Sequence, residues 1–112
     1  MSTQEIVMVI TNLPDRAEAE RVAETLIREG AAACINILAE CTSLYQWNGK
    51  LNHTREVPLL IKTTRAAYPH LESLLCELHP YELPELIAVP VTTGLPAYLN
   101  WVMQETQPRK NK

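Results

Sequence analysis

The dipeptide Asn48-Gly49, which lies between two long stretches of strand-like sequence, constrains the fold more than any other feature. Asn-Gly is the strongest short-range indication of a two-residue β-hairpin turn, because both turn residues take positive φ angles that few other pairs adopt easily. Strand-like sequence extends back to about Cys34 and forward to about Thr63, so each arm has roughly thirteen residues and spans about 43 Å. A compact chain of 112 residues is only about 34 Å across. The hairpin is therefore longer than the domain that carries it.

The tip of this hairpin carries large side chains that a single arm would leave in water. Leu44, Trp47 and Leu51 all lie close to the turn, and another copy of the chain packed along the arm is the simplest cover for them. We therefore predict a homo-oligomer with Leu44, Trp47, Leu51 and Trp101 in its interface. The aromatic side chains have two interpretations, a ligand cage and the more favoured protein interface; they are Tyr45, Trp47, Tyr81, Tyr98 and Trp101.

Length and charge narrow the class of protein. The 112 residues predict one domain, 1–112, with an ordered core of about 5–105. A net charge of −3 and only a short basic run at the C-terminus argue against nucleic acid or a membrane as a partner. No apolar stretch reaches the roughly eighteen residues of a membrane span, and no signal-peptide pattern is present at the N-terminus. Cys34, Cys41 and Cys76 form an odd set without metal-type spacing, which favours a cytoplasmic location.

Amphipathic helices are predicted before and after the hairpin. Asp15 and Glu18 form a capping-box pattern ahead of an apolar stripe over residues 19–27. A second apolar stripe covers residues 71–78, bounded by prolines. A third helix is expected from about residue 96, with inward-facing side chains that we predict to be Tyr98, Trp101 and Val102.

A short apolar run at residues 6–10 predicts a strand buried on both faces, and a second run at residues 86–89 predicts the last core strand. Pro58, inside the second hairpin arm, requires an edge position or a bulge because it has no N–H group. The order of elements is β-α-β-β-α-β with a trailing helix. This predicts the α+β class and a ferredoxin-like sandwich, an antiparallel sheet with two helices on one face. Self-association is the simplest cover for the other face.

The densest group of polar side chains lies between the second helix and the last strand, where His79, Glu82 and Glu85 are interspersed with prolines. Loops held by a rigid scaffold often carry function, and imidazole with carboxylates can bind a divalent cation. The alternative, favoured on spacing alone, is that His79 acts as a cation at the helix C-terminus. In that case the prolines only end one element and begin the next.

Other chemistry receives little support from the sequence. The histidines and cysteines show none of the usual metal-site spacings, and the chain has neither a nucleophile elbow nor a glycine-rich phosphate loop. No enzymatic activity is therefore predicted. Glu56 and Lys62 in the second hairpin arm either form a structural pair or flank a cleft as an acid and a cation.

Five segments in order carry a family resemblance: Ala-Cys-Ile-Asn at 33–36, Ser-Leu-Tyr-Gln-Trp-Asn-Gly-Lys at 43–50, Glu56 with Lys62-Thr63, His-Pro-Tyr-Glu-Leu-Pro-Glu at 79–85, and Tyr-Leu-Asn-Trp at 98–101. Together they resemble the CutA family of divalent-cation tolerance proteins, from residue 6 to about residue 103. The resemblance implies a ferredoxin-like subunit in a tight homotrimer similar to the PII signalling proteins. It also implies an intersubunit cleft lined by Asn36, Ser43, Tyr45, Glu56, Lys62, His79, Tyr81 and Glu85.

The resemblance further implies a part in tolerance of copper and other divalent cations, because some members of the family bind Cu(II). The ligands proposed in the family are a cysteine at the end of the first strand and histidines just before the Pro-Tyr pair. Here Ile10 stands in the cysteine position, and only His79 precedes Pro80. We expect weak binding of Cu(II) or another divalent cation by His79, Glu82 and Glu85, and no obligatory cofactor.

Two functions of different class remain open at this point. One is a metal-responsive binding protein that holds cations between its subunits. The other is a PII-like sensor or scaffold trimer, in which the intersubunit cleft takes a small metabolite and the effects of metals are indirect.

Overall fold

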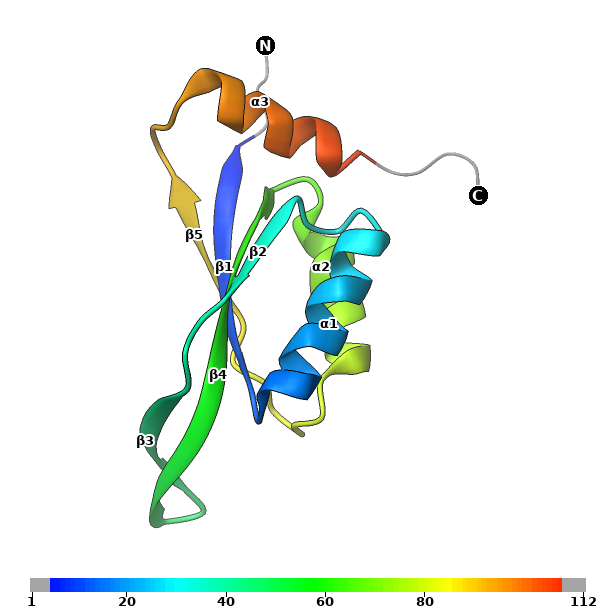
Figure 1. Ribbon diagram of the computed structural model, residues 1–112. Helices are drawn as coiled ribbons and strands as arrows, with labels where there is room; N and C mark the ends of the chain where they lie inside the picture. Colours follow the sequence, from blue (N-terminus) through cyan, green and yellow to red (C-terminus); the bar gives the residue numbers. More distant parts are fainter. Residues whose placement is uncertain (1–4, 108–112) are drawn as a thin grey trace.

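The computed structural model describes residues 5–107 of the 112 and has α+β architecture (Figure 1). Among these residues, no helix is long and apolar enough to cross a membrane. The elements in chain order are β1 (Ile6–Leu13), α1 (Arg16–Arg28), β2 (Cys34–Ile37), β3 (Cys41–Trp47), β4 (Lys50–Thr64), α2 (Tyr68–Leu78), β5 (Ile87–Val91) and α3 (Pro96–Glu105).

The sheet has the strand order β2-β4-β1-β5, with β3 continuing along β4, and its pairings are antiparallel. Both α1 and α2 cover one face, whereas α3 crosses one end of the sheet (Figure 1). This confirms the predicted ferredoxin-like arrangement. The main core lies between the sheet and the two helices, and its fully buried side chains include Val9, Leu13, Leu26, Leu59, Ile61, Leu71 and Leu75.

The first two helices begin for the local reasons expected from the sequence. The Asp15 carboxylate accepts the backbone N–H of Glu18 at 2.9 Å, which satisfies one of the free donors at the start of α1. Gly30, with φ of 74°, lies directly after this helix in the left-handed region that ends many helices. In α2, a proline occupies the first turn, where its missing N–H costs no helical hydrogen bond.

The hairpin turn is confirmed, but the first arm is divided. Asn48 and Gly49 have φ angles of 53° and 77°, as a type I′ turn requires. On the first arm, however, the strand is interrupted between Ile37 and Cys41, so two short strands face the long strand β4. The expected continuous arm of about thirteen residues is therefore wrong, and β4 alone extends through the full length of the hairpin.

A bulge explains this interruption. Ile37 pairs with Leu59 and Cys41 pairs with Glu56, so three residues of the first arm lie opposite two of β4. Pro58 is one of those two residues: its carbonyl oxygen accepts the Leu38 N–H at 2.9 Å, and its missing N–H falls opposite the bulge. This confirms the expectation that Pro58 needs a bulge.

The hairpin protrudes beyond the rest of the molecule (Figure 1). The structure as a whole measures 48 × 32 × 23 Å along its principal axes. The hairpin tip is exposed as predicted: Leu44 is 59% exposed and Leu51 is 61% exposed. The tip points away from α1 and α2, so neither helix covers it. These side chains have no cover within the described part of the chain.

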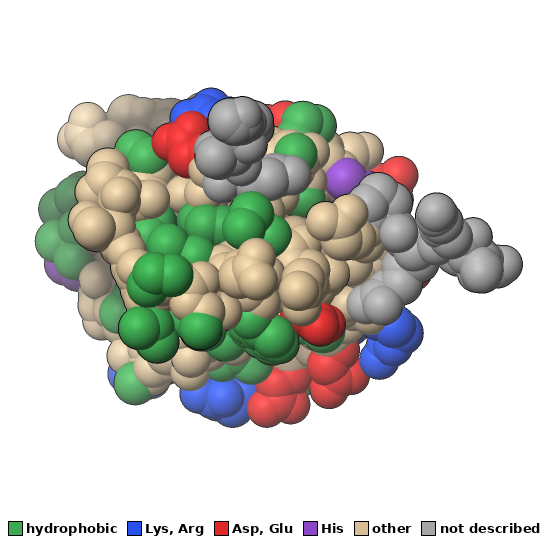
Figure 2. Space-filling view, turned by 90° about the horizontal axis from the view of Figure 1, so that it is seen from above, with side chains coloured by type: hydrophobic (Ala, Val, Ile, Leu, Met, Phe, Trp, Pro, Cys, Tyr) green, Lys and Arg blue, Asp and Glu red, His purple; other side chains and the backbone are tan. Residues whose placement is uncertain are grey.

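The inward face of α3 differs from the prediction. Val102 is fully buried and packs with Leu99 and Met103, whereas Tyr98 and Trp101 are exposed and lie with their rings 5.7 Å apart. The prediction is therefore confirmed for Val102, whereas Tyr98 and Trp101 remain 39% and 41% exposed. Figure 2, seen from the end that α3 crosses, shows hydrophobic side chains gathered on the surface, with charged side chains at the rim. Like the hairpin tip, this surface is apolar area that the described part of the chain leaves exposed.

Candidate functional site

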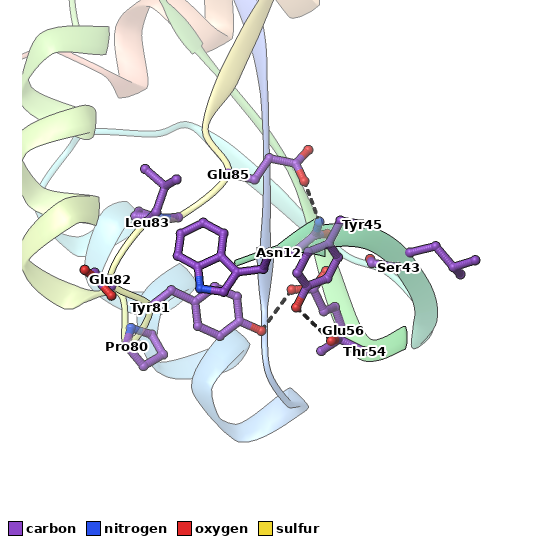
Figure 3. Close-up of a pocket in the computed structure, with 13 residues that line it drawn as sticks. Asn12, Ser43, Tyr45, Thr54, Glu56, Pro80, Tyr81, Glu82, Leu83 and Glu85 are labelled. Atoms are coloured by element: carbon purple, nitrogen blue, oxygen red, sulfur yellow. Dashed lines mark hydrogen bonds between the residues drawn. The ribbon is translucent and has the colours of Figure 1, made fainter. Parts of the chain in front are cut away.

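A cavity of about 820 Å³ lies between the hairpin and the segment that joins α2 to β5 (Figure 3). Its size falls in the range of small-molecule sites in proteins. Three parts of the chain form it: the end of β1, the tip half of β3 and β4, and residues 80–85. The lining residues are Asn12, Ser43, Leu44, Tyr45, Trp47, Thr54, Glu56, Pro80, Tyr81, Glu82, Leu83, Pro84 and Glu85.

The Glu56 carboxylate is the most buried charged group of this pocket, with only 6% of the residue exposed. The Tyr81 hydroxyl donates a hydrogen bond to Glu56 Oε2 at 2.9 Å and joins the loop to β4 (Figure 3). Burial and this carboxylate together raise the pKa of Tyr81, so its hydroxyl stays protonated and remains a donor. Glu56 Oε1 makes no hydrogen bond among the described residues. The pocket therefore contains a buried carboxylate with one oxygen available as an acceptor.

His79 anchors the loop that joins α2 to β5, but it does not itself line the pocket. Its Nε2 donates to the Asn12 carbonyl oxygen at 2.7 Å, and the backbone N–H of Tyr81 donates to its Nδ1 at 3.2 Å. The residue is only 7% exposed, and burial lowers the pKa of the imidazole. The ring is therefore neutral at pH 7, and the interpretation of His79 as a cation at the helix C-terminus is wrong.

The metal site proposed from the sequence is not assembled within the chain. Both His79 nitrogens are hydrogen-bonded, Glu85 Oε1 accepts from the Asn12 amide at 2.8 Å, and Glu82 is exposed. Over residues 5–107, no group of three or more His, Cys, Asp or Glu side chains is arranged to hold a metal ion. Glu82 and Glu85 do line the same pocket, so two of the three predicted ligands lie at one site.

Of the eight predicted cleft residues, five come together in the pocket, Glu85 among them, whereas Asn36, Lys62 and His79 do not line it. Ser43, Tyr45, Glu56 and Tyr81 line it, whereas Lys62 donates to Asn36 on the neighbouring strand β2. Lys62 lies six residues beyond Glu56 along the extended strand β4, which separates their α-carbons by about 20 Å. Glu56 and Lys62 thus neither pair with each other nor flank one cleft within this chain.

Asn12 and Thr54 are pocket residues that the sequence interpretation missed. Thr54 shares the parity of Glu56 on β4, so the alternation of side chains along a strand could have placed it on the same side. Its hydroxyl lies 2.8 Å from the Tyr45 hydroxyl across the hairpin. Asn12 had no such local signal, because it reaches the pocket only through the pairing of β1 with β4.

Comparison with known proteins identifies the family. Residues 7–105 match the model of the CutA1 divalent ion tolerance protein family. The chain belongs to this family. A relative from Thermus thermophilus, the divalent-cation tolerance protein CutA, is 38% identical over 99 residues, covering 88% of this chain and 96% of that protein.

Solved CutA structures agree with the fold. CutA from Xylella fastidiosa superimposes with a TM-score of 0.89 at 41% identity, covering 91% of this chain and 98% of the other. The periplasmic divalent cation tolerance protein CutA from Archaeoglobus fulgidus has a TM-score of 0.88 at 27% identity, covering 91% and 99% of the two chains. The match to the CutA1 family includes every residue that lines the pocket, so the pocket is a part of the family domain.

Proposed function

We propose that this CutA1-family protein contributes to divalent-cation tolerance as a binding protein, with the pocket between the hairpin and residues 80–85 as its cation site. One observation carries the proposal: Glu56, Glu82 and Glu85 line the pocket, and no lysine or arginine is found among its lining residues in the described part of the chain. A concave site lined by charge of one sign concentrates ions of the opposite sign. The family is named for divalent-ion tolerance and not for a reaction, which favours binding over catalysis.

The proposed ion is Cu(II) or another divalent cation, held by Glu82 and Glu85 with His79. Carboxylate oxygens and imidazole nitrogen are accepted ligands for such ions. The lone pair of His79 Nδ1 accepts the backbone N–H of Tyr81 and has to give up this hydrogen bond for the ion, so binding is expected to be weak. No obligatory cofactor is proposed.

Titration calorimetry with Cu(II) at pH 7.5 tests this function. We expect micromolar binding that is lost in His79→Ala and in the double variant Glu82→Gln/Glu85→Gln. His70→Ala is the matched control, because His70 is exposed on the first turn of α2 and does not line the pocket. Unchanged affinity in both pocket variants would contradict a metal site here.

A second candidate function is a PII-like sensor or scaffold that takes a small organic molecule in the same pocket. The cavity of about 820 Å³ favours it, because a single metal ion would fill only a small part of that volume. The expected assembly is a homotrimer in which the exposed hairpin tips cover one another, and the pocket would then open between subunits.

The three cysteines are unpaired within the chain, which supports a cytoplasmic location. The Archaeoglobus fulgidus relative is described as periplasmic, so cell fractionation is the appropriate test.

A further inference from the structure

We propose that the pocket takes an organic cation, namely a primary ammonium group carried on a short apolar chain. The inference rests on the proposed function in one respect, that this pocket is the binding site, and it names the chemical class of a second ligand. Three features of the site carry it: a buried acceptor, aromatic walls and an apolar rim.

The buried acceptor is Glu56. Its Oε2 already accepts from the Tyr81 hydroxyl, while Oε1 has no hydrogen-bond partner among the described residues. Oε1 opens onto the pocket from a residue that is only 6% exposed, and such a carboxylate oxygen is stabilised by a cation that brings its own N–H donors. A primary ammonium group has three such donors on a compact positive charge. A neutral alcohol would bring one donor and no charge, and an anion would be repelled.

The aromatic walls are supplied by Tyr45 and Trp47 from the hairpin and by Tyr81 from the loop. The negative face of an aromatic ring attracts ammonium groups, most strongly where water is excluded. Tyr45 is held in place by the hydrogen bond between its hydroxyl and Thr54. Tyr81 is held by Glu56 and packs against the His79 ring with centroids 4.8 Å apart. Two of the three rings are therefore fixed before any ligand arrives.

The rim adds apolar surface from Leu44, Leu83 and the prolines Pro80 and Pro84. An ammonium group at Glu56 would direct its alkyl chain along this surface. A bare divalent cation makes no use of aromatic or aliphatic walls, whereas an alkylammonium ion uses all of the lining. The size and composition of the pocket therefore fit the organic cation better than they fit a metal ion alone.

A matched pair of probes tests the charge directly. Butylammonium chloride and butan-1-ol have the same chain and differ in the charged group, so each is titrated into the ¹⁵N-labelled protein at pH 7. We expect butylammonium to bind at least tenfold more tightly and to shift the amide signals of residues 54–56, 81–83 and 85. Equal affinity for the two probes, or shifts confined to other parts of the chain, would overturn the proposal.

Two pairs of variants locate the site. Glu56→Gln should weaken butylammonium binding at least tenfold, while Glu24→Gln, which removes an exposed carboxylate from α1, should leave it unchanged. Tyr45→Leu should weaken binding about threefold through loss of the ring face, whereas Tyr45→Phe keeps the ring and should retain binding. The Tyr45 pair keeps the test decisive even if Glu56→Gln fails to fold. Wild-type affinity in Tyr45→Leu would contradict the aromatic site.

The Cu(II) titration separates this inference from the proposed function. Binding of Cu(II) without binding of butylammonium overturns the organic cation and leaves the metal function in place. Binding of butylammonium without Cu(II) supports the organic cation and removes the metal. If neither probe binds, both proposals are wrong.

Discussion

The two halves of strand β4 follow one sequence pattern but differ in burial: the half beside the helices is buried, and the half at the hairpin tip is exposed. Val57, Leu59 and Ile61 share the parity of Leu51, so all four side chains point to the same side of the strand. The first three are at most 4% exposed, because α1 and α2 cover them, whereas Leu51 is 61% exposed near the hairpin tip. Alternation along a strand thus specifies which side a residue faces. Whether the residue is buried depends on which other elements pack against that side of the strand.

The apolar side chains of the covered half are buried within the described part of the chain, and those of the tip half are not. Leu44 and Trp47 on β3 and Leu51 on β4 leave apolar surface in water, and so do Tyr98 and Trp101 on α3. Exposed surface of this kind usually marks a protein interface. We therefore expect the covered half to be stabilised within the subunit and the tip half to gain stability from association with other copies.

The largest expected effect is on the oligomeric state. Burial of even about 1,000 Å² of apolar surface contributes roughly 25 kcal/mol before the costs of association, so a trimer should persist on dilution. Light scattering coupled to size exclusion at low micromolar concentration should give three times the 12.7 kDa of one chain. The double variant Leu44→Ser/Leu51→Ser should lower this mass towards that of the monomer. A wild-type protein that elutes as a monomer would remove the argument for an interface at the tip.

A smaller and more local effect is expected within the subunit. Leu59→Ala, in the covered half of β4, should lower the free energy of unfolding by about 2–5 kcal/mol, since it leaves a cavity in the core. Leu51→Ala makes the same chemical change on the same face of the same strand. In a Leu44→Ser background, once light scattering shows it to be monomeric, Leu51→Ala should lower the free energy of unfolding by less than about 0.5 kcal/mol. Urea unfolding of both variants measures the difference, and similar losses would mean that the tip is buried within the subunit.

Local sequence signals predicted most of the body of the protein. The Asp15 cap and the Asn48-Gly49 turn each depend on neighbours in the chain, and both were found as expected. The division of the first hairpin arm was missed, although Pro58 indicated a bulge. The error on α3 has a similar cause, because Tyr98 and Trp101 are apolar residues on a helix whose exposed side is itself apolar.

The site was less predictable because its parts come from distant segments. The sequence identified Tyr81, Glu56 and Glu85, but the pairs that matter are Tyr81 with Glu56 and Glu85 with Asn12, which are set by strand pairing and loop position. The sequence interpretation singled out His79 in the loop. Its hydrogen bonds to the backbone of Asn12 and Tyr81 could not be read from spacing, and they explain why it is a neutral anchor.

The smallest expected effect concerns this anchor, which joins the body to the pocket. Burial lowers the pKa of His79 in the folded protein below the value of about 6.5 expected when the chain is unfolded. Between these two values the unfolded state binds more protons, so stability is full above about pH 6.5 and declines as the pH falls through the folded pKa. Urea midpoints measured from pH 8 to pH 5 should fall for the wild type. His79→Gln should be less stable at pH 8, because it loses the neutral ring, and should show a flatter pH profile.

His53→Gln is the control for this pH profile, because His53 is exposed near the hairpin tip and should keep the wild-type slope. The pH window stays above the range in which carboxylates such as Glu5 titrate. If His79→Gln and His53→Gln follow the wild-type profile equally, then His79 is not held neutral by its contacts. The loop would then be anchored by the Tyr81–Glu56 hydrogen bond alone, and Tyr81→Phe would be expected to loosen it without any dependence on pH over this window.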